Sequence, residues 1–263
     1  MKEKLIVLGA GESGIGAAIL GKQKGYEVFL SDANEIPVSL QNILNDKGIL
    51  WESGQHSLSS MEGASIAVKS PGIPGNIPLL NGLRAKGTRI ISEIEFAAQS
   101  TSATLIGITG TNGKTTTTMM TYEILKNAGL NVGLAGNIGS SFAKQVAEED
   151  YEFYVLEISS FQLDDIDQFA PHIALITNIT PDHLDRYDYS FEAYIQAKLK
   201  ITKNQSSKNF FLFNSDDEVL VKTLNNHKIN AQKVPFGSHA EYISGSYLED
   251  GKIILKHQNQ TTM

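Results

Sequence analysis

The sequence predicts an α/β fold with mainly parallel sheets, divided into two domains. The first observation behind this prediction is that strand-like and helix-like segments alternate through most of the 263 residues, as they do in parallel sheets covered by helices on both faces. The second is that two glycine-rich turns, at residues 9–14 and 110–115, each join an apolar strand to a helix. The third is a stretch of small polar residues near 92–103, which indicates a domain boundary.

The composition is that of an ordinary globular chain, with 41% apolar and 19% charged residues. The chain has no cysteine, which excludes disulfides and thiolate metal sites and favours a cytoplasmic location. No apolar run approaches the roughly 20 residues that cross a bilayer, so we expect no membrane association. A net charge of −7 argues against nucleic acid as a partner. Phosphorylated ligands would therefore have to be bound locally, by helix N-termini, a lysine or a metal ion.

The predicted first domain covers residues 1–92. Its expected strands are residues 5–8, 28–31, 66–68 and 89–92, and its expected helices are 14–24 and 37–46, with Pro37 suited to a first turn. A short helix over 94–99 lies at the boundary and fits either domain. The strand over 66–68 leads into the sequence Ser-Pro-Gly-Ile-Pro, which predicts a rigid loop.

The predicted second domain covers residues 93–263, where the alternation begins again. Its expected strands are residues 104–108, 132–135, 153–157, 173–177 and 210–213, and its expected helices are 114–127 and 191–202. Two short strand-like runs on either side of Asp250-Gly251 predict a β-hairpin near the end of the chain.

The first glycine turn has the pattern Gly9-x-Gly11-x-x-Gly14, and Asp32 ends the next strand. Glycines allow a tight turn close to a pyrophosphate, the helix N-terminus offers free N–H groups, and an acidic residue can accept from a ribose hydroxyl. The pattern predicts a nucleotide-type ligand but does not choose between a nicotinamide cofactor and another nucleotide. A turn with a purely structural role is the alternative. Glu12 would repel a phosphate unless its carboxylate points away from the ligand.

The second glycine turn, Gly110-Thr111-Asn112-Gly113-Lys114-Thr115, resembles a phosphate-binding loop between a strand and a helix. Its backbone N–H groups can surround phosphate oxygens, the lysine can neutralise them, and the Thr115 hydroxyl can bind Mg²⁺. The usual loop has a further glycine at the position of Ile108, so this is a variant of the pattern.

Three further groups of polar residues follow the predicted strands of the second domain. Glu157 ends one strand and His183 follows another, and together with the Thr115 hydroxyl they make a plausible site for a hard cation. Imidazole is an unusual ligand for Mg²⁺, so His183 needs a special reason to take part. Asp182 can alternatively cap a helix. Lys198 and Lys200 lie on a predicted helix, where the ordinary interpretation is a solvated face.

Several motifs in combination resemble the ATP-dependent Mur ligases of peptidoglycan precursor synthesis. They are TGTNGKTT, GNIG at 136–139, LEISSFQLD, NITPDHLDRY and AKLKI. The motif SSFQLD, with GAGESG and SPGIP in the first domain, is most similar to the members that act on UDP-N-acetylmuramoyl-L-alanine and D-glutamate. The resemblance covers essentially the whole chain. It implies a Rossmann-like UDP-binding domain, then a P-loop-type central ATPase domain with a mainly parallel sheet.

The resemblance also implies an activity. ATP would phosphorylate the carboxylate of UDP-N-acetylmuramoyl-L-alanine. The amine of D-glutamate would then attack the resulting acyl phosphate, and phosphate would leave. We expect the enzyme to be a monomer. The residues implied to bind ATP are Gly110, Thr111, Asn112, Gly113, Lys114, Thr115 and Thr116. Thr115 and Glu157 would bind one Mg²⁺ and His183 a second, supported by Lys198 after its conversion to a carbamate with CO₂. The residues implied to bind UDP-N-acetylmuramoyl-L-alanine are Gly11, Glu12, Ser13, Gly14, Asp32, Ser70, Pro71, Gly72, Asn137, Gln162 and His183.

The chain departs from the family pattern at its end. The segment that helps to hold adenine and the C-terminal domain that binds D-glutamate are expected after residue 263, so we expect a fragment that binds UDP but does not complete the reaction. Three alternatives stay open at this point. They are a non-catalytic UDP-sugar-binding module, a nicotinamide-dependent oxidoreductase built on the first glycine turn, and a ligase similar to folylpolyglutamate synthase.

Overall fold

The computed structural model describes residues 2–238, 244–257 and 260–262. The chain forms two compact units. The first unit contains Met1–Ala103, Gly133–Glu152 and Phe161–Phe169, and the second contains Thr104–Val132, Phe153–Ser160 and Ala170–Met263. Each unit is an α/β structure with a mainly parallel sheet, so the predicted fold class is confirmed. The division at residue 92 stays a prediction.

The sheet of the first unit has the strand order β3-β2-β1-β4-β5, and every pair is parallel. Its strands are β1 (Lys4–Leu8), β2 (Glu27–Ser31), β3 (Leu50–Glu52), β4 (Ile66–Lys69) and β5 (Arg89–Ser92). Leu5 to Leu8 of the central strand are fully buried, which explains their uninterrupted apolar sequence. The chain passes from β1 to β2 on one side of the sheet and from β4 to β5 on the other. The loops that follow β1 and β4 therefore separate at the carboxyl ends of these strands, where the first glycine turn begins.

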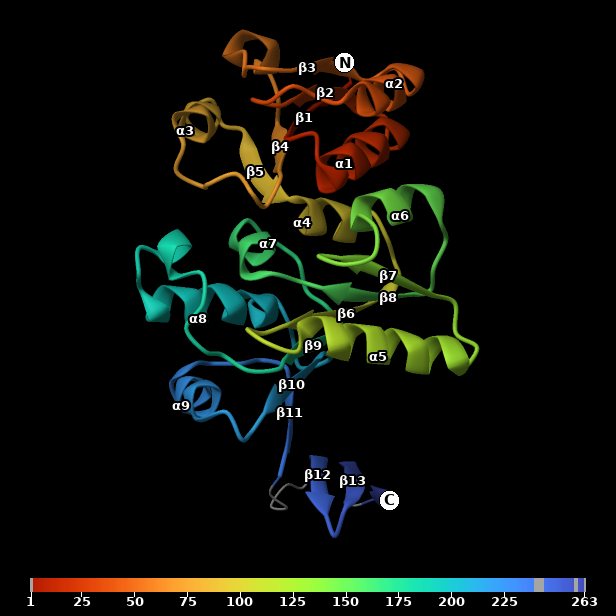
Figure 1. Ribbon diagram of the computed structural model, residues 1–263, viewed down its shortest axis with the longest axis vertical. Coiled ribbons are helices and arrows are strands. Elements are labelled where there is room, and N and C mark those ends of the chain that lie inside the picture. Colours follow the sequence, from red (N-terminus) through yellow and green to blue (C-terminus); the bar gives the residue numbers. More distant parts are fainter. Residues whose placement is uncertain (1, 239–243, 258–259, 263) are drawn as a thin grey trace. The chain divides into compact units, whose positions relative to one another are not determined.

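The helices assigned mainly to the first unit are α1 (Glu12–Gln23), α2 (Val38–Asp46), α3 (Pro78–Ala85), α4 (Glu93–Ala98), α6 (Phe142–Glu148), α7 (Ser160–Asp164) and the 3₁₀ helix η1 (Leu58–Met61). Helix α6 lies beside α1 and α4 (Figure 1). The prediction that Pro37 is the first residue of α2 was wrong by one residue. Pro37 has an extended backbone and precedes Val38, the first helical residue. Strand β3 and helices α3, α6 and α7 were not predicted.

The segment Phe161–Phe169 is anchored within the first unit by Glu95. This fully buried carboxylate accepts from the backbone N–H groups of Asp167, Gln168 and Phe169 at 2.9, 3.0 and 2.8 Å. Hydrogen bonds to an ionised group are stronger than neutral ones, and a buried carboxylate without donors is costly. One side chain therefore fixes a segment that is more than 60 residues away in sequence.

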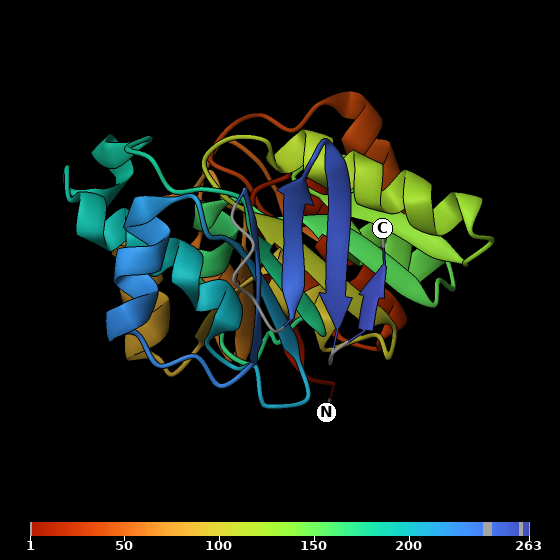
Figure 2. The same cartoon turned by 90° about the horizontal axis from the view of Figure 1, so that it is seen from below.

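Within the second unit the strands follow the order β14-β13-β12-β11-β10-β9-β6-β8. Their bounds are β6 (Thr104–Thr109), β8 (Phe153–Glu157), β9 (Ile173–Ile176), β10 (Phe210–Asn214), β11 (Gln232–Gly237), β12 (Gly245–Glu249), β13 (Lys252–His257) and β14 (Gln260–Thr262), and β7 is Val132–Gly136. Pairing is parallel from β8 to β12. Strands β12 and β13 form an antiparallel hairpin, which confirms that prediction (Figure 2).

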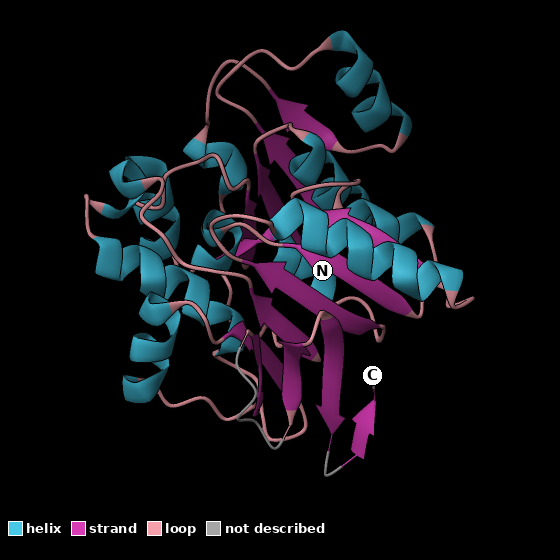
Figure 3. Ribbon diagram, turned by 60° about the horizontal axis from the view of Figure 1, so that its bottom comes forward, coloured by secondary structure: helices cyan, strands magenta, loops and turns pink. Residues whose placement is uncertain are grey.

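The helices of the second unit are α5 (Lys114–Asn127), α8 (Phe191–Leu199) and α9 (Glu218–Asn226), with 3₁₀ turns η2 (Leu184–Tyr187) and η3 (Lys200–Thr202). Helix α5 lies on one side of the sheet and α8 and α9 on the other (Figure 3). The helix predicted over 191–202 becomes a 3₁₀ turn after Leu199. In the described ranges, none of the helices has the length and apolar character that a membrane span requires.

Candidate functional site

The second glycine turn is a backbone cradle at the start of α5. Gly110 has a φ of 147°, and a Cβ atom there would collide with the Thr177 hydroxyl. Gly113 has a φ of 77° and is the N-cap of α5. Both positions therefore require glycine, and the N–H groups of the first helical turn remain available for an anion. Ile108, the departure from the usual pattern, is a fully buried residue of β6.

A hydroxyl and a carboxylate meet beside this cradle. The Thr115 hydroxyl donates to Glu157 Oε2 at 2.7 Å, and Glu157 is only 1% exposed at the end of β8. Oxygen donors of this kind fit Mg²⁺, which keeps several waters and takes its other ligands from phosphate. Among the described residues no group of three or more histidine and acidic side chains could hold a metal by itself. The protein would therefore supply only part of the coordination sphere.

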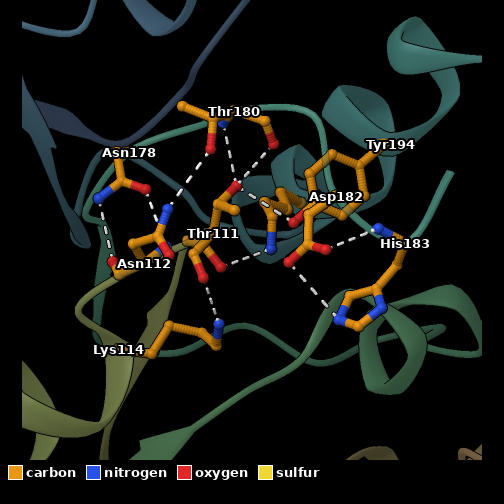
Figure 4. A network of polar contacts seen from close by, with 10 residues as sticks. Thr111, Asn112, Lys114, Asn178, Thr180, Asp182, His183 and Tyr194 are labelled. Atoms are coloured by element: carbon orange, nitrogen blue, oxygen red, sulfur yellow. Dashed lines mark hydrogen bonds and ion pairs between the residues drawn. The ribbon is translucent and has the colours of Figure 1, made fainter.

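Reciprocal hydrogen bonds join the loop after β9 to this backbone cradle (Figure 4). The N–H of Thr111 donates to the Asn178 carbonyl at 2.9 Å, and the N–H of Asn112 donates to the Asn178 side chain at 2.9 Å. The Thr111 hydroxyl accepts from the N–H of Thr180 at 3.0 Å. The sequence placed these residues near a strand end but gave no sign that they bond to one another.

The lysine of the cradle, Lys114, points back over the loop and donates to the Thr111 carbonyl at 2.8 Å (Figure 4). His183 lies farther along the loop after β9, with its side chain 59% exposed and Nε2 3.6 Å from Asp182 Oδ2. The interpretation of Asp182 as a helix cap is wrong. His183 itself occupies the cap position of η2, in the left-handed conformation, and its N–H donates to the Asp182 carboxylate at 2.9 Å.

Lys198 is a buried side chain, only 1% exposed, so the solvated-face interpretation is wrong for this residue. Its Nζ donates to the Gly110 carbonyl at 2.6 Å and lies 4.6 Å from the centre of the Tyr194 ring. Burial, together with the nearby Lys114 charge, lowers the pKa of Lys198 to about 7, and the Asp182 charge opposes the shift. The structure thus places a buried amine with a lowered pKa directly against the backbone of the second glycine turn.

A cavity of about 440 Å³ adjoins the cradle within the second unit. Polar groups of Asn112, Thr177 and Asn178 line one part of it. Apolar side chains line much of the rest, and they come from β9, β10 and β11: Leu175, Leu212, Val234, Pro235 and Phe236. An apolar cavity with a few polar groups is the usual form of a small-ligand site. This cavity was not predicted from the sequence, because its walls come from strands that carry no motif.

The first glycine turn is held by its own acidic residue. A Cβ atom at Gly14 would collide with the Gly9 carbonyl, so the turn requires glycine there. Asp32 accepts from the N–H of Ala10 at 2.6 Å through one oxygen and from the N–H of Asn34 at 2.8 Å through the other. Asp32 therefore shapes the turn itself, a role that the sequence did not predict.

Glu12 points away from the first glycine turn and toward the start of α6. Its carboxylate accepts from the N–H of Ser141 at 3.0 Å. This contact removes the conflict between a carboxylate and a phosphate that the sequence raised. Asn137 lies in the loop between β7 and α6, and Gln162 lies on α7, where it is buried.

The Ser70-Pro71-Gly72 loop is fixed by a buried cation. Lys69 Nζ donates to the Ile73 carbonyl at 2.8 Å and lies 3.0 Å from Asp165 Oδ2. These two charged side chains are 3% and 13% exposed. The Ser70 hydroxyl is buried and has no hydrogen-bond partner within the part of the chain that is described.

The chain is similar to known proteins over most of its length. The Mur ligase middle domain model matches residues 108–263. The chain is 51% identical over 253 residues to UDP-N-acetylmuramoylalanine--D-glutamate ligase of Bacteroides fragilis, covering 96% of this chain and 57% of that protein. For the protein of the same name from Christiangramia forsetii, the identity is 46%, with 98% and 58% covered. The chain therefore spans little more than half the length of these relatives.

A solved structure shares the fold. It is UDP-N-acetylmuramate:L-alanyl-gamma-D-glutamyl-meso-diaminopimelate ligase from Neisseria meningitides, with a TM-score of 0.62 and 20% identity, covering 96% of this chain and 86% of that chain. The family model itself covers more than half of the sequence, including the phosphate cradle, Glu157, His183 and Lys198. On these findings, the chain belongs to the Mur ligase family.

Proposed function

We propose that the protein is an ATP-dependent ligase that joins D-glutamate to UDP-N-acetylmuramoyl-L-alanine through an acyl phosphate. The observation that carries the proposal is the phosphate cradle with the Thr115 hydroxyl 2.7 Å from the buried Glu157 carboxylate. A carboxylate is a poor electrophile, so a ligase of this kind needs ATP to make a leaving group. The names of the relatives supply the substrates in the proposal.

ATP would bind as a substrate along the second unit. The backbone from Gly110 to Thr116 and the Lys114 ammonium would hold its phosphates, because N–H groups and a cation stabilise the charge that moves during phosphoryl transfer. The base would occupy the cavity of about 440 Å³ beside the cradle.

Mg²⁺ fits the donor set at the cradle, and Thr115 and Glu157 are the residues that would hold it. When bound, the ion neutralises phosphate oxygens and so favours transfer of the phosphoryl group. His183 would take part in a second cation site together with substrate oxygens. That part of the proposal rests on the position of His183 in the loop that is bonded to the cradle.

Lys198 would be converted to a carbamate by CO₂. The support is geometric: the amine is buried, none of the ion pairs of the described residues involves it, and its nearest polar contact is the Gly110 carbonyl. An uncharged amine is the form that reacts with CO₂, and the lowered pKa of Lys198 makes that form accessible near neutral pH. The resulting anion would face the cation site from the side of α8.

UDP-N-acetylmuramoyl-L-alanine would bind to the first unit. The turn formed by Gly11, Ser13 and Gly14 and the loop Ser70 to Gly72 lie at the carboxyl ends of β1 and β4, where ligands of parallel sheets bind. Asn137 and Gln162 would contact the muramoyl-alanine part. In this proposal residues 1–92 would form the core of the UDP-binding domain, and residues 93–263 would form the ATPase part.

Turnover of the full-length protein tests the proposal. Phosphate release and amide product are measured with ATP, Mg²⁺, UDP-N-acetylmuramoyl-L-alanine and D-glutamate. We expect product to depend on all four, and we expect Lys114→Ala to lower kcat by about 100-fold or more, since it removes a phosphate-stabilising cation. Lys126→Ala, an exposed lysine at the far end of α5, is the matched control and should keep full activity. Absence of D-glutamate-dependent product would overturn the proposal.

A further inference from the structure

Two carboxylates from distant parts of the first unit meet at the first turn of α6. Glu12, the first residue of α1, accepts from the N–H of Ser141 at 3.0 Å. Glu93, the first residue of α4, accepts from the Ser141 hydroxyl at 2.7 Å and from the N–H of Ala143 at 2.6 Å. Ser141 is therefore bonded to both carboxylates while its hydroxyl also accepts from the N–H of Lys144 at 3.2 Å. We call these residues the α6 clamp: Glu12, Glu93 and Ser141.

The α6 clamp is tightly packed. Ser141 and Glu93 are each 3% exposed. Gly16 of α1 faces Ser141, and a Cβ atom at this glycine would collide with the serine hydroxyl and crowd the N–H of Lys144. The absence of a side chain at Gly16 thus allows α1 to approach α6 closely enough for Glu12 to reach the Ser141 N–H.

The loop that carries Asn137 is bonded rigidly to the same helix. Gln145 of α6 donates to the Leu134 carbonyl at 2.6 Å and to the Ser140 hydroxyl at 2.8 Å. Gly139 has a φ of 76°, and a Cβ atom there would collide with the Leu134 carbonyl. Because the two ends of the loop are held by α6, the position of α6 decides the position of Asn137.

Hydrogen bonds thus connect two predicted substrate contacts, the first glycine turn and the loop that carries Asn137, through α6. Glu12 lies between Gly11 and Ser13 of the first glycine turn, and its carboxylate holds the helix that positions the Asn137 loop. The Glu12 carboxylate is unsuited to bind a phosphate, because its negative charge would repel the ligand. Its carboxylate is instead used as an acceptor inside the protein.

We infer that Glu12 and Glu93 are positioning residues that fix the distance between the first glycine turn and the Asn137 loop. This inference rests on the proposed function. A ligand that engages both segments, UDP-N-acetylmuramoyl-L-alanine, benefits from a preset distance, because less conformational freedom is lost on binding. A ligand that engages the glycine turn alone, UDP, gains nothing from it. Glu12 is accordingly removed from the direct ligands of the substrate.

The test compares these two ligands on the full-length protein. In Glu12→Ala, we expect the Kd and KM of UDP-N-acetylmuramoyl-L-alanine to rise about tenfold, the range for loss of one hydrogen bond to a charged group. The Kd of UDP, the KM of ATP and kcat should stay within about twofold of wild type. Glu12→Gln keeps an oxygen acceptor and should recover most of the lost affinity. Glu27→Ala removes an exposed carboxylate of β2 and is the control.

Several results would overturn the inference. Equal weakening of UDP and of UDP-N-acetylmuramoyl-L-alanine in Glu12→Ala would show a direct ligand, and no weakening of either would show no role. Failure of Glu12→Gln to recover affinity would also contradict it. Glu93→Gln, which keeps one acceptor oxygen in the buried site, should reproduce the selective loss to a smaller degree. Failure of the proposed function shows itself separately, as absence of D-glutamate-dependent product from the wild-type protein.

Discussion

Glu93 gives the chain a pH-dependent stability that a single substitution can remove. Burial raises the pKa of the Glu93 carboxyl from 4.5 to about 7, and the nearby Glu12 charge contributes to the rise while hydrogen bonds from Ala143 and Ser141 oppose it. In Glu93→Gln the side chain keeps nearly the same shape and one oxygen to accept from these two donors. The variant therefore loses the titration while keeping most of the packing.

The sign and size of the effect follow from proton linkage. Below pH 4.5 the carboxyl is protonated in both states, and the raised pKa contributes its full stability there. As the pH rises from about 4.5 to about 7, the unfolded chain ionises first, so stability falls, and above about 7 it no longer changes. Between pH 5 and 8 we expect the wild-type protein to lose about 2 to 3 kcal/mol relative to Glu93→Gln.

Urea unfolding at several pH values measures this difference. The single tryptophan, Trp51, lies on β3, so its fluorescence reports on the first unit, where Glu93 is located. Glu27→Gln, an exposed carboxylate of the same unit, controls for the loss of one acidic residue. If the wild-type protein and Glu93→Gln differ by the same free energy at pH 5 and pH 8, the reasoning from burial is refuted.

Three further substitutions test the sites. Gly110→Ala should abolish ATP binding, measured by calorimetry, because the added methyl group collides with the Thr177 hydroxyl and the backbone has a φ of 147°; retained affinity would contradict the cradle. Thr115→Val should weaken Mg²⁺-dependent ATP binding about tenfold and leave metal-free binding nearly unchanged, and equal loss in both conditions would exclude a metal ligand. Asp165→Ala leaves the buried Lys69 ammonium without its ion-pair partner, so the free energy of unfolding in urea should fall by about 3 to 5 kcal/mol. The double variant Lys69→Met/Asp165→Leu removes both charges, and a smaller loss there would show that the cost comes from the unpaired charge and not from packing.

The turn between β6 and α5 could be predicted from the sequence because its geometry is local. Gly110, Gly113 and Lys114 lie within five positions of one another, and this spacing by itself predicts a turn between a strand and a helix. Ile108 takes the place of the usual glycine as a fully buried residue of β6, a strand that the sequence also predicts. The fold class was predictable for the same reason, since apolar strands such as Leu5–Leu8 leave a clear mark in the sequence.

The environments of single side chains could not be predicted, because they depend on segments far away in the chain. Lys198 lies on a helix, where a lysine is ordinarily solvated, yet it is buried and its Nζ donates to the carbonyl of Gly110, 88 residues earlier in the chain. The direction of Glu12 is set by Ser141, which is 129 residues away. Short helices such as α3 and α6 were missed because their apolar pattern is too brief to show a helical period.

The path of the chain limits how this protein can be divided. The first unit is assembled from three separate stretches, and its buried acceptors Glu93 and Glu95 receive their donors from the second and third of them. A fragment ending at residue 103 would leave these two carboxylates without their donors, and a fragment ending at residue 92 would lack the carboxylates themselves. Neither is a good unit for expression or for domain exchange. A fragment that keeps these hydrogen bonds must also contain Gly133–Glu152 and Phe161–Phe169. Recombination between relatives at a single crossover point is therefore unfavourable, because it would separate these stretches from the rest of the first unit.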